Sequence, residues 1–168
     1  TRSLYVVVSK KVLLSEKDLN GMLQYVDNGN QLFIAAEYID ETLLDTLGVQ
    51  VQYYSLSSMF QSQVSSKGPM RYSTVQFSDS NLLGKQRYGF FYYPFDANFV
   101  HTDSIGASTL GLNESGDPNY ISVVYGKGRF FFHLHPQTFS NYFLLSRNNK
   151  EYLEKALSYT AADRYAIY

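Results

Sequence analysis

The chain has 168 residues, 45% hydrophobic and 17% charged, and its 14 Lys and Arg residues nearly balance 15 Asp and Glu residues, for a net charge of −1. This length suits one domain with one good core. The charge balance predicts neither a basic face for nucleic acid nor a cationic surface for anionic lipid. Cysteine is absent, which excludes disulfides, thiolate metal sites and every cysteine-nucleophile mechanism. The hydrophobic runs are far shorter than the ~20 residues of a membrane helix.

The first third of the chain has the pattern of a strand–helix–strand unit. Residues 4–8 are a continuous hydrophobic run, which predicts a strand buried on both faces. Ser15 can cap the helix that follows, and this helix ends at residues 28–30. Its hydrophobic stripe has helical spacing and consists of Leu19, Met22, Leu23 and Val26. Residues 32–36 form the next buried strand, so the two strands are expected to be parallel.

The next segments are shorter. The pattern of residues 41–47 predicts a helix that ends at Gly48. Its inward-facing residues are Leu43, Leu44 and Leu47. Residues 49–54 alternate as a one-sided strand. Residues 55–67 are rich in Ser and Gln, and we expect a surface excursion there.

From Ser73 onward, strands alternate with turn residues. Strands are predicted at residues 74–77, 88–95, 99–102, 120–125 and 129–134. A tight hairpin at Gly126-Lys127-Gly128 joins the last two, and a final helix begins near Asn149. The expected fold class is therefore α/β, with a parallel strand–helix–strand core first and an antiparallel, hairpin-rich second half.

The aromatic residues comprise 16 Tyr and 12 Phe with no Trp. Tyrosine suits half-buried sheet positions, where its ring packs and its hydroxyl stays in water. The simplest interpretation is a tyrosine-rich sheet, and the alternative is a face that stacks on carbohydrate.

Two histidines stand out by position. His133 and His135 are two residues apart on a predicted strand, so both rings should point to one face, just before Pro136. Ligand crevices of open α/β sheets lie at such strand ends. The pair could hold a metal if Asp96, Asp103 or Glu37 converged on it. No recognised zinc spacing accompanies the pair, so hydrogen-bonded structural histidines are the favoured interpretation, and we expect no cofactor.

Glu37 follows the buried strand at residues 32–36, where a strand-to-helix turn would present its side chain above the sheet. There it could contact a ligand or act as a general base. The favoured alternative is a helix N-terminal carboxylate stabilised by the helix dipole. The sequence contains no H-E-x-x-H or G-x-S-x-G motif and no phosphate-binding glycine loop.

Two long segments carry a family resemblance. Residues 125–136 read Y-G-K-G-R-F-F-F-H-L-H-P and continue into F-S-N-Y-F-L-L at residues 139–145. The other segment runs from L-S-E at residues 14–16 through D-N-G-N-Q-L-F-I-A-A at residues 27–36 to L-L-D-T-L-G at residues 43–48. Together they resemble the bacterial domain-of-unknown-function 4350 family, over most of the chain.

The resemblance implies a three-layer fold similar to class I glutamine amidotransferases, with a mixed, largely parallel sheet and helices on both faces, in one domain over residues 1–168. It also implies a membrane-anchored parent, often encoded near a MoxR-type AAA ATPase, which makes that ATPase system the expected protein partner. Because the chain starts at Thr1 and shows no signal peptide, we expect a soluble fragment of that parent. The expected location is the periplasmic face of the inner membrane, with the cytoplasm as the alternative.

Amidotransferases of this fold class use a cysteine after a central strand and a His-Pro-Glu motif. Here the turn reads Ala-Ala-Glu37-Tyr, and the later motif reads His135-Pro136-Gln137. Nucleophile and acidic partner are both absent, which excludes the acyl-transfer cycle.

The leading functional hypothesis is a non-catalytic binding or interaction domain with no catalytic residues. Its candidate ligand-binding residues are Glu37, His133, His135 and Asn141. The alternatives are a metal-assisted hydrolase built on the two histidines and a carboxylate, and a glycan-binding module.

Overall fold

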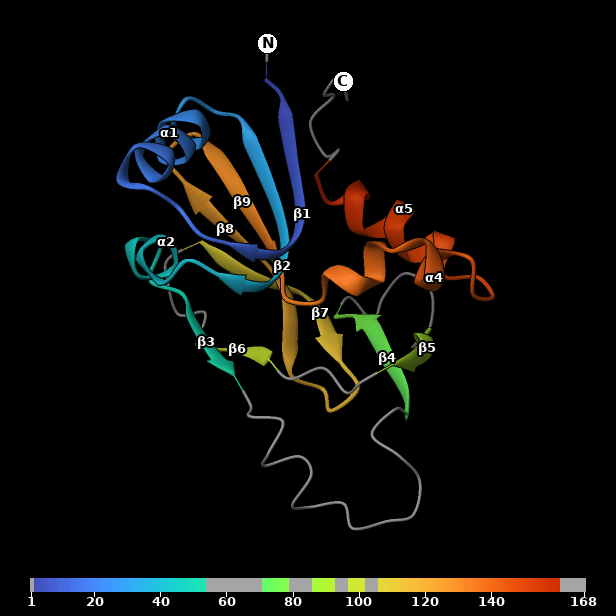
Figure 1. Ribbon diagram of the computed structural model, residues 1–168. Helices are drawn as coiled ribbons and strands as arrows, with labels where there is room; N and C mark the ends of the chain where they lie inside the picture. Colours follow the sequence, from blue (N-terminus) through green and yellow to red (C-terminus); the bar gives the residue numbers. More distant parts are fainter. Residues whose placement is uncertain (1, 54–70, 79–85, 93–96, 102–105, 161–168) are drawn as a thin grey trace.

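The computed structural model describes residues 2–53, 71–78, 86–92, 97–101 and 106–160 (Figure 1). Its strands are β1 (Leu4–Val12), β2 (Gln31–Ile39), β3 (Gln50–Tyr53), β4 (Arg71–Phe77), β5 (Tyr88–Tyr92), β6 (Ala97–His101), β7 (Ala107–Asn113), β8 (Pro118–Tyr125) and β9 (Gly128–His133). Its helices are α1 (Glu16–Asp27), α2 (Glu41–Thr46), the 3-10 turn η1 (Pro136–Phe139), α4 (Asn141–Leu144) and α5 (Lys150–Ser158). The predicted excursion at residues 55–67 lies outside the described residues.

One sheet contains seven of these strands, in the order β1-β2-β9-β8-β7-β4-β5. β1, β2 and β9 are parallel, whereas the pairs from β9 to β5 are antiparallel. β3 and β6 form a separate antiparallel pair. The α/β class and the antiparallel second half are confirmed. The sheet is mixed instead of largely parallel, because β9 joins the parallel strands directly from the β8–β9 hairpin and no crossover helix precedes it.

β1 differs from its prediction. It pairs in parallel with β2, as expected, but it lies at the end of the sheet (Figure 1). Tyr5, Val6 and Val8 are therefore exposed, and the prediction of a strand buried on both faces is wrong. A hydrophobic run predicts a strand, but strand order decides how much of it is covered.

The helix at residues 16–27 forms as its sequence predicts. The Ser15 side chain accepts a hydrogen bond from the Asp18 amide, and the Asp18 carboxylate accepts one from the Ser15 amide, so both halves of a capping box are present. The predicted stripe packs inward, with Val26 fully buried. Gly29, at φ 96°, carries the chain out of the helix.

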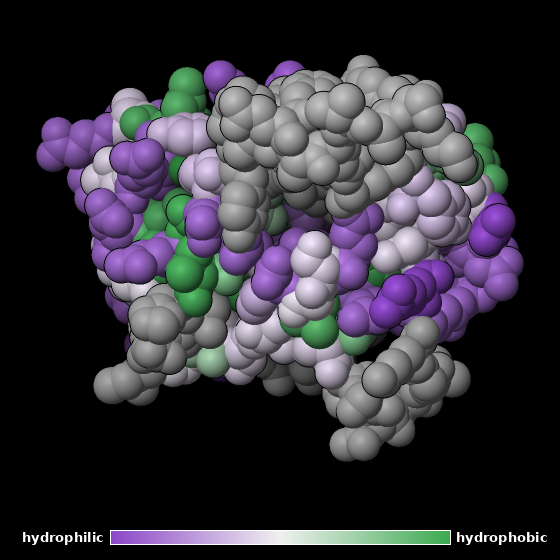
Figure 2. Space-filling model, turned by 90° about the horizontal axis from the view of Figure 1, so that it is seen from below, coloured by the Kyte–Doolittle hydropathy of each residue, from purple (hydrophilic) through white to green (hydrophobic). Residues whose placement is uncertain are grey.

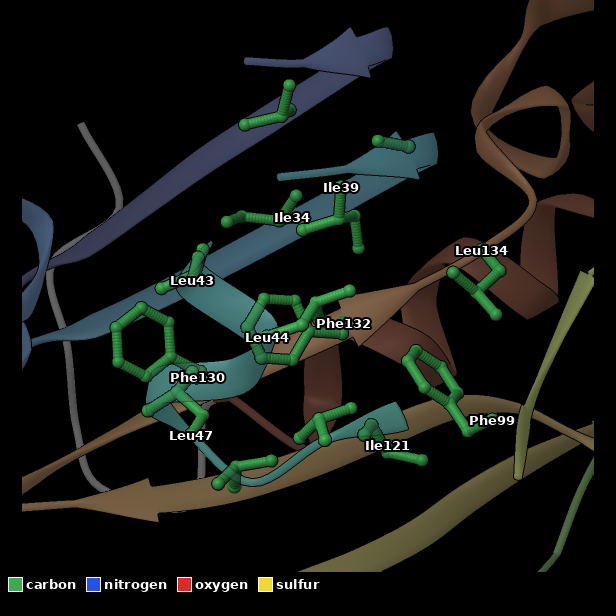
Figure 3. Close-up of a cluster of buried hydrophobic side chains, with 14 of the residues drawn as sticks. Ile34, Ile39, Leu43, Leu44, Leu47, Phe99, Ile121, Phe130, Phe132 and Leu134 are labelled. Carbon is green, nitrogen blue, oxygen red and sulfur yellow. The ribbon is translucent and has the colours of Figure 1, made fainter. Parts of the chain in front are cut away.

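The main core lies between these first helices and one face of the sheet. Leu43, Leu44 and Leu47 of the α2 region pack onto β2, β8 and β9, as predicted (Figure 3). The buried residues drawn with them include Ile34, Ile39, Phe99, Ile121, Phe130, Phe132 and Leu134. Asp40, not Glu37, caps α2, because the Asp40 side chain accepts from the Thr42 amide.

The opposite face of the sheet is covered by the C-terminal helices. Phe33, Tyr120 and Phe131 point to this side and pack with Ala156 of α5 and with Phe139. A neighbouring cluster joins Tyr152 to the β4–β5 end of the sheet. α5 begins after Asn149, as predicted. Among the described residues, no helix is long and hydrophobic enough to cross a membrane.

The hairpin at residues 126–128 is also confirmed. Tyr125 pairs with Gly128 across a two-residue loop, and Gly126 has a φ of 56°. The face seen from below Figure 1 mixes hydrophilic and hydrophobic side chains among the described residues (Figure 2).

Candidate functional site

The two histidines singled out by the sequence lie together inside the protein. His133 is the last residue of β9, and His135 directly precedes η1. Their ring centroids are 5.9 Å apart and the rings meet edge to face. Both side chains are buried, with no more than 2% of either residue exposed.

His133 belongs to an aromatic cluster under α5. Its Nε2 lies 2.7 Å from the hydroxyl of Tyr152, and its ring contacts Tyr120 and Phe139. Burial lowers the pKa of His133 to about 3, so the imidazole is neutral at physiological pH. Burial also raises the pKa of Tyr152, which keeps its hydroxyl protonated.

The hydrogen bonds of His133 determine its tautomer. The backbone N–H of His135 donates to Nδ1 of His133 at 3.1 Å, so this nitrogen carries a lone pair. In the neutral ring the proton is then on Nε2, which donates to the Tyr152 oxygen. Both ring nitrogens are therefore engaged within the protein, and metal coordination would require breaking one of these bonds.

His135 is tied to a different set of neighbours. Its Nδ1 lies 3.0 Å from the side-chain amide nitrogen of Asn119, and its carbonyl accepts from the Thr138 hydroxyl at 2.7 Å. Burial lowers the pKa of His135, and the neighbouring His133 lowers it further. A hydrogen bond to the Ala97 backbone acts in the opposite direction.

Glu37 is bonded to residues other than the two buried histidines. β2 continues through Ile39, so Glu37 is a strand residue, and its placement in a strand-to-helix turn is wrong. Its carboxylate accepts a hydrogen bond from Nε2 of Gln137 and lies 3.9 Å from Nζ of Lys10. Glu37 thus links the carboxyl ends of β1 and β2 to the turn after β9.

Asn141, the fourth candidate ligand-binding residue, does not join these groups. Asn141 is an exposed residue at the start of α4, whereas Asn149 is the buried asparagine that donates to the carbonyls of Gly89 and Phe143. Asp96 and Asp103 lie outside the described residues. Within the part of the chain that the structure describes, no three His, Asp or Glu side chains form a metal-binding group.

Sequence reasoning missed the exposed hydrophobic surface. Tyr5, Val6 and Val8 lie on the edge strand β1. On the strand at the other end of the sheet, Phe91 packs against Tyr72, and the Arg147 guanidinium lies 5.4 Å from the Tyr72 ring centroid. Strand order would have been needed to find either surface, and no local pattern supplies it.

The family model described as "Domain of unknown function (DUF4350)" matches residues 1–157. No curated protein matches the chain. The family match covers both of the buried histidines and the edge strand, and it includes every element from β1 to nearly the end of α5.

Solved structures share the fold at low sequence identity. The mmIFT52 N-terminal domain has a TM-score of 0.66 at 14% identity, over 98% of this chain and 79% of that chain. The cytoplasmic protein STM3548 from Salmonella typhimurium has a TM-score of 0.55 at 10% identity, over 94% and 71%. The exo-beta-1,4-mannosidase Op5Man5 from Opitutaceae bacterium strain TAV5 has 0.54 at 12%, over 95% of this chain but 25% of that chain. At these identities the likeness shows the fold alone, and none of the three is described as an amidotransferase.

Proposed function

Because the chain belongs to the DUF4350 family, which its model matches over residues 1–157, we propose that it is a non-catalytic binding or interaction domain. The observation that carries this proposal is the burial of His133 and His135, the best candidates for chemistry in the sequence. Neutral imidazoles bonded to Tyr152 and Asn119 stabilise a core, and their burial keeps both rings away from a substrate in solvent.

The metal-assisted hydrolase is the weaker alternative. It needs a carboxylate beside the two histidines, but Glu37 is bonded to Gln137 and belongs to no three-residue metal group among the described residues. The glycan-binding alternative gains nothing from the mannosidase, because a likeness at 12% identity shows the fold alone. An interaction domain needs only surface, and the ends of the sheet supply exposed hydrophobic side chains.

The proposal extends to a cellular setting that the family resemblance implies. The domain would belong to a membrane-anchored bacterial parent, face the periplasm and work with a MoxR-type AAA ATPase system. We also propose that its fold is a variant of the three-layer glutamine amidotransferase-like class. The helices packed on both faces of β2 and β9 support that assignment.

A cross-linked affinity pull-down of the full-length parent from native membranes tests the function. We expect a specific protein partner, with the AAA ATPase or a neighbour first among the candidates. Recovery of the bait alone, or a robust hydrolytic rate in the purified domain, would overturn the proposal. Metal analysis gives an independent check, since stoichiometric zinc or manganese that is lost in the His133→Ala, His135→Ala variant would favour the hydrolase.

A further inference from the structure

The strand β1 has nine residues and lies at the end of the sheet, and its outer edge pairs with no other strand among the described residues. Its other edge is paired with β2 in one constant parallel register, from Leu4↔Gln31 to Val12↔Ile39. A long strand edge of this kind is a template for another strand. Proteins either protect such an edge or use it to bind an added strand.

The register shows which backbone groups are available. The Ser3 carbonyl accepts a hydrogen bond from the Gln31 amide at 2.9 Å, so Ser3 turns its backbone toward β2. Backbone groups of successive strand residues point to alternate edges. Leu4, Val6 and Val8 therefore turn their N–H and C=O groups away from β2, in the spacing that an added strand requires.

The side chains along this edge are hydrophobic on both faces of the strand. Val6 and Val8, which point to the α5 side, are 43% and 49% exposed, and Tyr5, which points to the α1 side, is 58% exposed. An added strand could cover both rows at once. Removing such side chains from water would add a favourable hydrophobic term to the backbone hydrogen bonds.

The charges along β1 select the kind of strand that fits. Lys10 and Lys11 are exposed near its carboxyl end, Lys10 at 78%, and β1 contains no acidic residue. A parallel pairing of two β1 strands would place lysines beside lysines. An antiparallel pairing over the hydrophobic residues would bring Arg2 of one copy close to Lys10 and Lys11 of the other. Like charges in such positions are destabilising, so a second copy fits poorly.

We propose that β1 binds an extended segment of a protein partner by strand addition. The segment carries β-branched side chains against Tyr5, Val6 and Val8, and acidic side chains beside Lys10 and Lys11. This inference rests on the proposed interaction function and deepens it, because it names the surface and the chemistry of the partner.

Fluorescence anisotropy with synthetic peptides tests the charge requirement on the full chain. The probes are labelled peptides of alternating Val and Thr with two Glu residues at either end, and matched peptides with two Lys residues instead. Of the two Glu peptides, one with Glu at its amino end and one with Glu at its carboxyl end, we expect the tighter binder to bind roughly fivefold more tightly than the Lys peptide of the same design. Two exposed ion pairs account for this difference. The preference should shrink at high salt. Equal affinities for both peptides, or no binding of either, would overturn the proposal.

Two variants locate the binding site. Lys10→Glu combined with Lys11→Glu should reverse the peptide preference, and circular dichroism checks that this variant folds, because Lys10→Glu also removes the exposed ion pair with Glu37. Val6→Pro should weaken binding of the Glu peptide roughly tenfold, because it removes an outward N–H and sets a proline ring on the edge. Val6→Thr retains the N–H and serves as the matched control. A charge-reversed protein that still prefers the Glu peptide would place the site elsewhere.

The same variants separate this inference from the proposed function. If the parent captures a specific partner and Val6→Pro captures it equally well, the interaction function stands and the β1 site is wrong. If the wild-type parent captures none, the interaction function itself fails. Light scattering tests whether a second copy of this chain pairs with β1 instead. Self-association that Val6→Pro abolishes would show such a pairing and would overturn the proposal.

Discussion

The hydrogen bond between His133 and Tyr152 ties β9 to α5 at a distance of 2.7 Å in a buried site. Tyr152→Phe keeps the ring but leaves the imidazole proton without its acceptor. We expect the free energy of unfolding to fall by about 1–3 kcal/mol, the cost of an unsatisfied buried polar group. Urea denaturation measures this loss. Tyr142→Phe is the matched control, since Tyr142 is 61% exposed and its hydroxyl can bond to water.

The same histidines predict how stability depends on pH. In the folded protein burial lowers the pKa of His133 to about 3, whereas an unfolded imidazole has a pKa of about 6.5. Above pH 6.5 both states are neutral. As the pH falls below 6.5, the unfolded chain takes up protons that the folded protein does not, so the free energy of unfolding decreases. His133 alone should account for about 2 kcal/mol at pH 5, and His135 acts in the same direction.

Urea midpoints between pH 8 and pH 5 measure this effect, and His133→Phe is the control. The variant should be less stable at every pH, because Tyr152 loses its partner, but its free energy of unfolding should depend less steeply on pH. Asp18 and Asp40 do not confuse the result. Hydrogen bonds from Ser15 and Leu14 lower their carboxyl pKa values, so their contributions are lost only below roughly pH 4. An unchanged slope in His133→Phe would contradict the assignment.

At the scale of elements, Gly128 fixes the contact between the β8–β9 hairpin and the end of α1. A Cβ at this position would overlap the carbonyl oxygens of Val26 and Asn30, which are backbone atoms that cannot turn aside. Gly128→Ala should therefore cost about 2 kcal/mol or more, as overpacking does. The contrast is Gly21 on α1, where a Cβ meets nothing within 4 Å. Gly21→Ala should stabilise the protein by about 0.5–1 kcal/mol. Thermal or urea unfolding of both variants tests the pair.

Local patterns predicted the elements whose signals are themselves local. The Ser15 cap, the Gly126 turn and the leucines of α2 each act within a few residues, and all three are found. β7 was missed because Ser108, Thr109 and Gly111 dilute its hydrophobic pattern. The strand forms through its pairing with β8 and β4, and such partners are not visible in a short window.

The candidate site was predictable only in part, for the same reason. A spacing of two brought His133 and His135 together, and the rings do meet. His133 lies under α5, whose Tyr152 bonds to it from nineteen positions along the chain, whereas His135 is bonded to Asn119 of β8. Glu37 was misplaced because β2 continues to Ile39, paired with Val12 of β1. Tertiary pairing decides both outcomes, so residue type and spacing could suggest a site but could not show whether it was open.

At the scale of the whole molecule, one sheet separates two packed regions. Leu44 and its neighbours fill the side of α1 and α2, whereas the fully buried tyrosines Tyr88, Tyr120 and Tyr152 lie on the side of α5. β2 and β9 contribute to both regions, with Ile34 and Phe132 on one side and Phe33 and Phe131 on the other. Neither region can keep its packing if these two strands separate, so we expect both regions to unfold together.

Leu44→Ala tests this coupling. The substitution leaves a cavity on the α1–α2 side and should lower the free energy of unfolding by about 2–5 kcal/mol. Near-ultraviolet circular dichroism follows the buried tyrosines, which lie across the sheet, while the far-ultraviolet signal follows the backbone. Both urea transitions should shift by the same amount if the shared strands couple the two regions. A tyrosine transition that stays at the wild-type midpoint would show that the α5 side unfolds by itself, and the sheet would then be a boundary between two units instead of one common core.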